Sequence, residues 1–203
     1  MIRLDVRLVS RLSPAMAALR GEGWAEQVPG PARDEFDPRS LHLVVERQGR
    51  PLGTVRITLG DPSVLACWSR KRAPLPHGPG VAELTRGVVA APARRIGLYR
   101  LAMLETVLRL RRLGASIATA AVEPDFPGRR FLADLGFVDV GGPVRFDDSP
   151  RADTLAQPIV LEIDDGRESR WTAMWQRQVD DLLTAGYAVT SEVASPASPA
   201  GVA

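Results

Sequence analysis

The chain has 203 residues, 45% of them hydrophobic, which is enough to bury a core of its own. Its 26 basic and 24 acidic residues nearly cancel, and no dense basic block is interleaved with aromatic residues, which argues against a nucleic-acid-binding protein. No apolar run approaches the ~20 residues that a membrane-spanning helix needs, and arginines interrupt the N-terminal segment where a signal peptide would be apolar, so we expect a cytoplasmic protein.

Two antiparallel strands are predicted over residues 40–49 and 50–60, joined by a turn at residues 48–50. Residues 61–80 are rich in proline and glycine, which predicts a long surface loop, and loops of that length are commonly functional. The single cysteine, Cys67, lies there. It rules out an internal disulfide, and we interpret it as a buried apolar residue.

An apolar strand is predicted over residues 81–90, although Glu83 and Arg86 interrupt it. A loop with Arg94, Arg95 and Gly97 follows and leads into a helix that ends near residue 114. The next strand covers residues 115–124, so the unit predicts a right-handed crossover between parallel strands. A helix start can hold a phosphate, and the arginines would strengthen that binding. Arginines that only solvate the loop are the alternative.

The rest of the chain predicts a short helix ending at Gly136, two closing strands over residues 138–142 and 157–164, and a helix over residues 167–187. Trp171 and Trp175 on this last helix are predicted to pack against the core. We therefore predict one α/β (α+β) domain over residues 1–189, built as a mixed sheet flanked by helices, and a disordered tail over residues 190–203.

Residues 81–146 resemble the core of the GNAT acyltransferase superfamily, with a strand, an Arg-x-x-Gly phosphate loop, a helix, a second strand and a short helix ending in "LADLGF". The resemblance implies a GNAT-type sheet whose central parallel strands, 81–90 and 115–123, splay apart around a thioester. It implies acyl-CoA or the acyl-phosphopantetheine of an acyl carrier protein as co-substrate, with no permanently bound cofactor. The donor-binding residues that it implies are Gly87, Val88, Val89, Arg94, Arg95, Gly97 and Leu98.

The segments "RDEFDPRSLHLVV", "GRPLGTVRIT" and "ELTRGVV" occur in an order similar to that in acyl-homoserine-lactone (autoinducer) synthases and N-acyl amino acid synthases. This likeness covers most of residues 18–163. It implies an acidic pair before the first sheet strand, a Gly-x-x-Arg on the next and a Glu-x-x-Arg on the central strand. The matching residues are Asp34 and Asp37, Gly53 and Arg56, and Glu83 and Arg86, with Arg20 and Trp24 matching an arginine and an aromatic residue on a mobile N-terminal segment.

The sequence departs from these patterns at three places. Tyr99 stands where the phosphate loop has its second glycine, which predicts looser pyrophosphate binding. Leu132 stands where many acetyltransferases have a tyrosine acid, which fits a thiolate leaving group, since a thiol of pKa ~8.5 departs without strong help. No second tryptophan follows Trp24, so lactone formation is not implied.

We expect Glu83 to act as the base, through water, with Arg86 beside it, and the backbone near Gly87 to polarise the thioester carbonyl. The residues expected to bind the acceptor are Arg20, Trp24, Asp34, Asp37 and Arg56. The alternative is a buried ionic network in which these charges only hold the fold together, since buried charges need partners. His42 and His77 have no companions at ligand spacing, so no metal site is predicted, and His42, on a strand, is interpreted as a hydrogen-bonded structural histidine.

The sequence thus predicts an N-acyltransferase that moves an acyl group from an acyl-carrier-protein or acyl-CoA thioester to the amine of a small amino-acid-like acceptor. Two alternatives remain at this point. One is a short-chain acetyl-CoA-dependent N-acetyltransferase of a small metabolite, and the other is a non-catalytic regulator that binds acyl thioesters.

Overall fold

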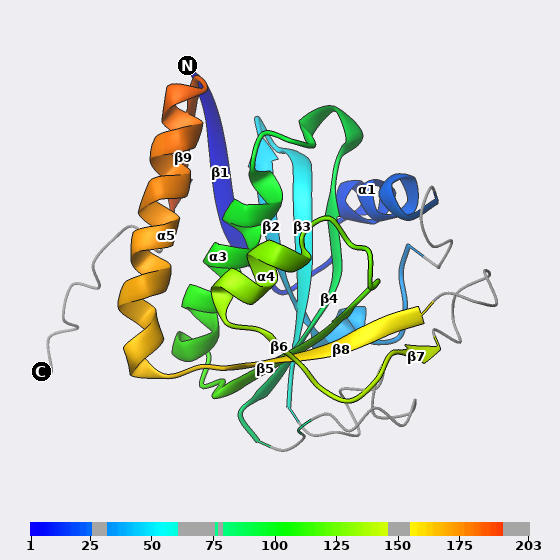
Figure 1. Ribbon diagram of the computed structural model, residues 1–203. Coiled ribbons are helices and arrows are strands. Elements are labelled where there is room, and N and C mark those ends of the chain that lie inside the picture. Colours follow the sequence, from blue (N-terminus) through cyan, green and yellow to red (C-terminus); the bar gives the residue numbers. More distant parts are fainter. Residues whose placement is uncertain (26–31, 61–75, 77–78, 146–154, 193–203) are drawn as a thin grey trace, which may run out of the picture.

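The computed structural model describes residues 1–25, 32–60, 76, 79–145 and 155–192. Cys67, His77 and almost all of the loop predicted over residues 61–80 lie outside this part. Within it, Figure 1 shows a sheet with helices packed against it. The elements in chain order are β1 (Ile2–Val9), α1 (Pro14–Ala25), η1 (Asp37–Arg39), β2 (Leu41–Arg47), β3 (Arg50–Leu59), β4 (Val81–Val89), η2 (Ala91–Ala93), α3 (Leu98–Arg112), β5 (Ile117–Val122), α4 (Arg129–Leu135), β6 (Val138–Asp139), β7 (Val144–Arg145), β8 (Leu155–Glu162), α5 (Asp165–Thr184) and β9 (Tyr187–Ser191).

The strand order is β6-β8-β5-β4-β3-β2-β1-β9, and β7 pairs with β8. The pairs β4–β5 and β1–β9 are parallel, and the other pairs are antiparallel. The predicted mixed sheet, the β2–β3 hairpin and the parallel strand–helix–strand unit are confirmed. The hairpin turns at Gln48 and Gly49, whose φ angles of 51° and 75° match the twist of the flanking strands.

The two faces of the sheet differ in polarity because neighbouring residues of a strand point to opposite sides. Alternate residues of the central strands join the hydrophobic core with α3, among them Val55, Ile57, Ala82 and Leu84. The residues between them point away from α3 and include Arg56, Thr58 and Glu83, all buried. The apolar face therefore carries α3, and the polar face carries the predicted site.

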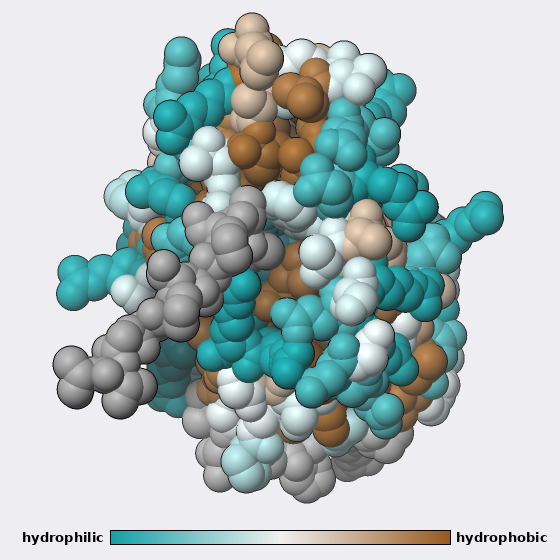
Figure 2. Space-filling view, turned by 90° about the vertical axis from the view of Figure 1, so that its left-hand side faces the viewer, coloured by the Kyte–Doolittle hydropathy of each residue, from teal (hydrophilic) through white to brown (hydrophobic). Residues whose placement is uncertain are grey.

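The helix α5 lies beside α3 and contributes Trp171 and Trp175 to the core, as predicted. Trp171 donates a hydrogen bond from Nε1 to the carbonyl oxygen of Leu135 over 2.9 Å. Figure 2, viewed from the side on which α5 lies, shows many hydrophilic residues on that surface, with hydrophobic ones between them. Among the described helices, none has the length and hydropathy that crossing a membrane requires.

The strands β1, β7 and β9, the helix α1 and the short helices η1 and η2 were not predicted from the sequence. The acidic pair therefore precedes β2, the second strand of the chain and not the first. The last strand, β9, includes Thr190 and Ser191, which the prediction gave to the tail, while residues 193–203 lie outside the described part. A buried carboxylate explains this: Glu105 of α3 accepts hydrogen bonds from Ser191 Oγ at 2.8 Å and Trp175 Nε1 at 2.7 Å, which fixes the end of β9.

Candidate functional site

The parallel ladder between β4 and β5 covers only four pairs, from Val81 with Ile117 to Leu84 with Ala120. Beyond them, residues 85–89 of β4 have no partner in β5, although β4 stays paired with β3 as far as Val89. We call the region between residues 85–89 and residues 121–122 the divergence. The two strands separate there, one residue after Glu83, as the sequence analysis expected.

A β-bulge in β4 accompanies the divergence. Thr85 pairs with Arg56 and Val88 pairs with Thr54, so Arg86 and a glycine of β4 lie opposite a single residue of β3. Arg86 has a φ of 55°, in the left-handed region that residues other than glycine rarely adopt. Because a bulge bends its strand and increases the local twist, it turns the second half of β4 away from β5.

The acidic pair binds the arginines of the polar face. Asp34 accepts a hydrogen bond from Arg86 Nη2 at 2.8 Å and another from Arg56 Nη1. Asp37 accepts one from Arg20 Nη1 at 2.7 Å and a longer one from Arg56 Nη1 at 3.4 Å. Four of the predicted acceptor-binding residues, Arg20, Asp34, Asp37 and Arg56, therefore lie in one ionic network with Arg86.

Asp37 is held as a carboxylate within this network. Its burial alone would raise the pKa of Asp37, but the hydrogen bonds from Arg20 and from the backbone N–H of Asp34, with the charges of Arg20 and Arg56, lower the pKa below the ordinary value. Burial also lowers the pKa of Arg20, against the attraction of Asp37. Arg20 and Asp37 therefore form a buried ion pair, in which each charge offsets the desolvation of the other.

His42 of β2 completes the network, which the sequence analysis did not anticipate. Arg20 Nη2 lies 2.9 Å from His42 Nδ1, and an arginine can only donate, so Nδ1 accepts. His42 Nε2 then carries the proton and donates to the carbonyl oxygen of Asp37 at 3.3 Å. Burial and the charge of Arg20 lower the pKa of His42 to about 4, so the ring is neutral at pH 7. It is a bonded structural histidine, as predicted.

Glu83 lies on the same face but outside the ion pairs. It is 2% exposed, and its Oε1 has no hydrogen-bond partner among the described residues. Burial raises the pKa of Glu83 to about 7, against the attraction of Arg56 and with a contribution from the Asp34 charge. A carboxyl group whose pKa is close to 7 is well suited to act as a general base near neutral pH.

Arg56 bridges the network and Glu83. Its Nε donates to Thr85 Oγ1 at 2.8 Å, and its guanidinium lies over the ring of Phe36, 5.6 Å from the centroid. Its Nη2 is buried and has no hydrogen-bond partner in the described structure. Since a buried N–H normally has a partner, this atom and Glu83 Oε1 are each available to a ligand or water.

Helix α1 covers this face at close range. A Cβ on Gly23 would overlap Cγ2 of Val88, so only glycine lets α1 approach β4 this closely. Arg20, 1% exposed, points from α1 into the network. The structure thus places Arg20 on a helix packed against the sheet, where the resemblance implied a mobile segment, while the side chain of Trp24 lies outside the described part.

The predicted donor-binding residues follow β4 directly. Arg94 donates from Nε to the carbonyl oxygen of Val89 at 3.2 Å, and Arg95 is exposed with a φ of 69°. Gly97, with a φ of 93°, is the N-cap of α3. The next residue, Leu98, is 1% exposed and belongs to the core, so only its backbone is available to a ligand.

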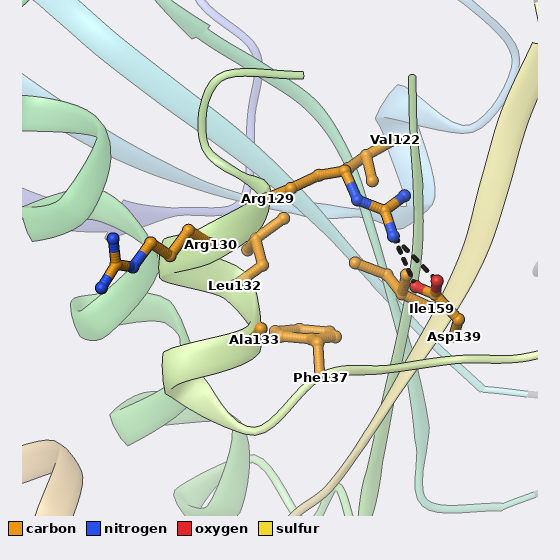
Figure 3. Close-up of a pocket in the computed structure, with 8 residues that line it drawn as sticks. All are labelled: Val122, Arg129, Arg130, Leu132, Ala133, Phe137, Asp139 and Ile159. Atoms are coloured by element: carbon orange, nitrogen blue, oxygen red, sulfur yellow. Dashed lines mark hydrogen bonds and ion pairs between the residues drawn. The ribbon is translucent and has the colours of Figure 1, made fainter. Parts of the chain in front are cut away.

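A pocket of about 220 Å³ lies beside the end of β5, between α4 and the strands β6 and β8 (Figure 3). Arg129 Nη2 donates to both carboxylate oxygens of Asp139, at 2.9 and 2.8 Å, along one side of it. The apolar lining consists of Val122, Leu132, Ala133, Phe137 and Ile159. None of the predicted site residues lines this pocket. The sequence signal for it was Leu132, an apolar residue at the position where many acetyltransferases have a tyrosine acid.

The comparisons with known proteins concern both sequence and fold. The family model described as the acetyltransferase (GNAT) family matches residues 10–137. No curated protein sequence matches the chain significantly. Among solved structures, the coenzyme-A-dependent acyl-homoserine lactone synthase BjaI with MTA is similar, with a TM-score of 0.65 and 15% identity over 90% of this chain and 98% of that chain.

Two other solved structures are similar over the conserved core of the fold. One is an acyl-CoA N-acyltransferase from Pseudomonas aeruginosa, with a TM-score of 0.58 and 20% identity over 77% of this chain and 98% of that chain. The other is the ribosomal-protein-S18-alanine N-acetyltransferase from Escherichia coli, with a TM-score of 0.55 and 16% identity over 78% of this chain and 94% of that chain. At these identities the likeness is one of fold.

Proposed function

Because the chain belongs to the acetyltransferase (GNAT) family, we propose that it transfers an acyl group from a coenzyme A or carrier-protein thioester to the amine of a small amino-acid-like acceptor. Family membership makes the chain an acyltransferase, which replaces the alternative of a non-catalytic binding protein. The observation that carries the rest of the proposal is the position of Glu83, buried one residue before β4 and β5 separate.

The divergence gives the donor a path through the sheet. The donor loop begins α3 on the apolar face, whereas Glu83 belongs to the polar face under α1. A pantetheine arm lying between the separated strands would bring its thioester from the first face to the second. Gly87, in the bulge, is absent from the pairing registers of β4 with β3 and with β5, so its backbone N–H is the group proposed to polarise the thioester carbonyl.

The reaction then needs one proton acceptor. The amine nitrogen attacks the carbonyl carbon, the carbon–sulphur bond breaks, and the amine proton passes to Glu83 directly or through water. The sulphur departs as a thiolate, which takes a proton from the solvent. Leu132, in place of a tyrosine acid, is consistent with a leaving group of pKa ~8.5 that needs no strong acid.

The charges around Glu83 favour an acceptor that carries a carboxylate. Arg20, Arg56 and Arg86 supply three positive charges, and the two carboxylates that bind them, Asp34 and Asp37, supply two negative ones. Glu83, when deprotonated, balances the remaining positive charge, so the site for a carboxylate is proposed at the unpartnered Nη2 of Arg56. A carboxylate that binds there would leave the amine of an amino acid within the same polar site as Glu83.

The pocket in Figure 3 suits an acyl chain longer than acetyl. Val122 lies two residues beyond Ala120, the last residue of β5 paired with β4, so the pocket adjoins the end of the divergence. Its lining is mainly apolar, as an acyl chain requires. We therefore prefer a medium- or long-chain donor to acetyl-CoA, and this preference is a separate part of the proposal.

The test is to incubate the purified protein with acyl-CoA donors of graded chain length, or with the matching acyl carrier proteins, and a pool of amino acids. Free thiol reports turnover, and product mass identifies donor and acceptor together. Products that join a medium or long acyl chain to an amino acid would support the proposal. Acetylated products alone would favour the short-chain alternative, and thiol release that no amine stimulates would contradict amine acylation.

A further inference from the structure

Tyr99, on the first turn of α3, occupies the position where a donor would have to pass between β4 and the segment after β5. We propose that Tyr99 is a specificity-determining residue that restricts access of the pantetheine arm, so that its ring must move aside before any donor binds. This inference rests on the proposed function. It concerns the strength of donor binding and adds no chemical step to the transfer.

The ring has one edge toward β4 and the other toward the start of α4, the helix that follows β5. A Cβ built on Gly87 of β4 would lie 3.9 Å from Cε2 of Tyr99, and a Cβ built on Gly128 would lie 3.0 Å from Cε1. Gly87 is three residues beyond the last β4–β5 pair, and Gly128 is the N-cap of α4, shortly after β5 ends. The ring therefore spans the opening from one side to the other.

Two further aromatic residues hold the ring in this place. Tyr99 packs edge to face against Phe126, with centroids 5.3 Å apart, and against Phe131, with centroids 6.3 Å apart. Its hydroxyl makes no hydrogen bond to another described residue, so packing alone fixes the side chain. Burial raises the pKa of Tyr99 above its ordinary value, although the side chain as a whole is only partly buried.

The start of α3 packs closely against another helix. A Cβ on Gly97 would overlap Nε2 of Gln178, which belongs to α5 and is 8% exposed. The backbone at Gly97 is thus backed by a buried side chain of another helix. The ring of Tyr99 is attached two residues later, so rotation of its side chain is the smallest change that opens the path.

Removal of the ring should strengthen donor binding, because the donor no longer has to displace Tyr99 from its aromatic neighbours. We expect Tyr99→Ala to bind coenzyme A and pantetheine 5- to 10-fold more tightly than the wild type in calorimetric titrations. Tyr99→Phe should bind like the wild type, because the hydroxyl has no partner among the described residues. Tyr187→Ala, which removes the chain's other tyrosine from β9, is the matched control and should leave both affinities unchanged.

The outcomes separate this inference from the proposed function. Wild-type binding that Tyr99→Ala leaves unchanged or weakens would overturn the role of Tyr99 and leave the proposed function intact. Failure of the wild type and of Tyr99→Ala to bind either probe would contradict the proposed function, and the inference would fall with it. Thermal unfolding of each variant checks the fold, and a Tyr99→Ala variant that is folded and binds more tightly supports the inference.

Discussion

Leu84 and Ala120 form the last pair of the parallel ladder between β4 and β5, and Glu83 precedes that pair on the polar face. The bulge at residues 86–87 explains why the ladder ends there, since it turns β4 while β4 remains bonded to β3. A buried carboxylate with an unpartnered oxygen therefore lies at the point where the sheet opens. The carboxylates of the ionic network, Asp34 and Asp37, are instead bound to arginines, and this difference is the ground for proposing a catalytic role for Glu83.

Glu83→Gln should abolish most activity without unfolding the protein. The amide cannot accept the amine proton, and the loss of a general base typically lowers the rate ~10²–10⁴-fold. Since no described hydrogen bond uses Glu83 Oε1, the substitution breaks no bond at that atom and removes a buried charge. The measurement is kcat/KM with the best donor, with Glu162→Gln, exposed at the end of β8, as the control. A Glu83→Gln enzyme with wild-type kcat/KM would reject the assigned base.

The pH dependence of the rate should report the same group. Glu83 acts as a base only when it is deprotonated, and burial raises its pKa to about 7. We expect kcat/KM to rise with pH through about 7 for an acceptor whose amine is kept neutral at that pH, such as an aromatic or hydroxylamine analogue. A rise centred on the ordinary carboxyl pKa, or one that survives in Glu83→Gln, would assign the ionisation to another group.

Asp37→Asn should mainly destabilise the fold. Asp37 and Arg20 form a buried pair, and removing one partner of such a pair typically costs ~3–5 kcal/mol because the other charge stays buried. Asp5→Asn is the matched control, since Asp5 pairs with Arg3 on the surface, where an ion pair contributes ~0–1 kcal/mol. Urea denaturation measures both. Equal losses of the free energy of unfolding would contradict the network described here.

The sequence predicted the β2–β3 hairpin and the β4–α3–β5 crossover because their signals are local, namely period-two alternation, turn residues and an apolar helical face. It did not predict β9, whose place depends on Glu105 and Trp175, which lie at least 82 and 12 positions earlier in the chain. The sequence does hold a local signal for the strand β1, because Leu4 and Val6 alternate with polar residues, and both are buried. Long-range bonds of this kind leave no periodic trace in a single sequence.

The candidate site was predicted in composition and only partly in geometry. Asp34, Asp37, Arg56 and Arg86 lie together as the resemblance implied, although their roles in binding stay predictions. His42 was expected to be structural, but its bond to Arg20 depends on how α1 packs, and α1 has a helical pattern obscured by a buried arginine and glycine. Residues that become neighbours only through packing are the ones that the sequence could not assign.

Stability should depend on pH through two groups with opposite effects. The pKa of Glu83 is raised from 4.5 to about 7, so the folded state binds more protons in that window and the contribution of Glu83 to stability falls as pH rises. The pKa of His42 is lowered from 6.5 to about 4, so its contribution is lost as pH falls through that window.

Where the two windows overlap, the effects should largely cancel in the wild type. Glu83→Gln removes one of them, so its free energy of unfolding should fall on acidification from pH 6.5 to 4, and at pH 8 it should equal or exceed that of the wild type. Chemical denaturation at several pH values measures the free energy of unfolding of the wild type and of Glu83→Gln. A flat profile for Glu83→Gln across the same range would mean that His42 is not held neutral by burial and the charge of Arg20.

Leu132→Trp should shift the donor preference toward short acyl chains. Leu132 is 2% exposed and lines the pocket of Figure 3. A larger side chain at this position would extend into the pocket and reduce its volume of about 220 Å³. If the acyl chain lies there, kcat/KM for long-chain donors should fall ~10–100-fold while that for acetyl-CoA stays within about 2–3-fold, since a few buried methylenes are each worth ~0.8 kcal/mol. Ala133→Ser, on the exposed rim of the same pocket, is the control. A loss that is equal for all chain lengths would show that Leu132→Trp perturbs the fold or the thioester position, and the acyl chain would then have to be sought elsewhere along the divergence.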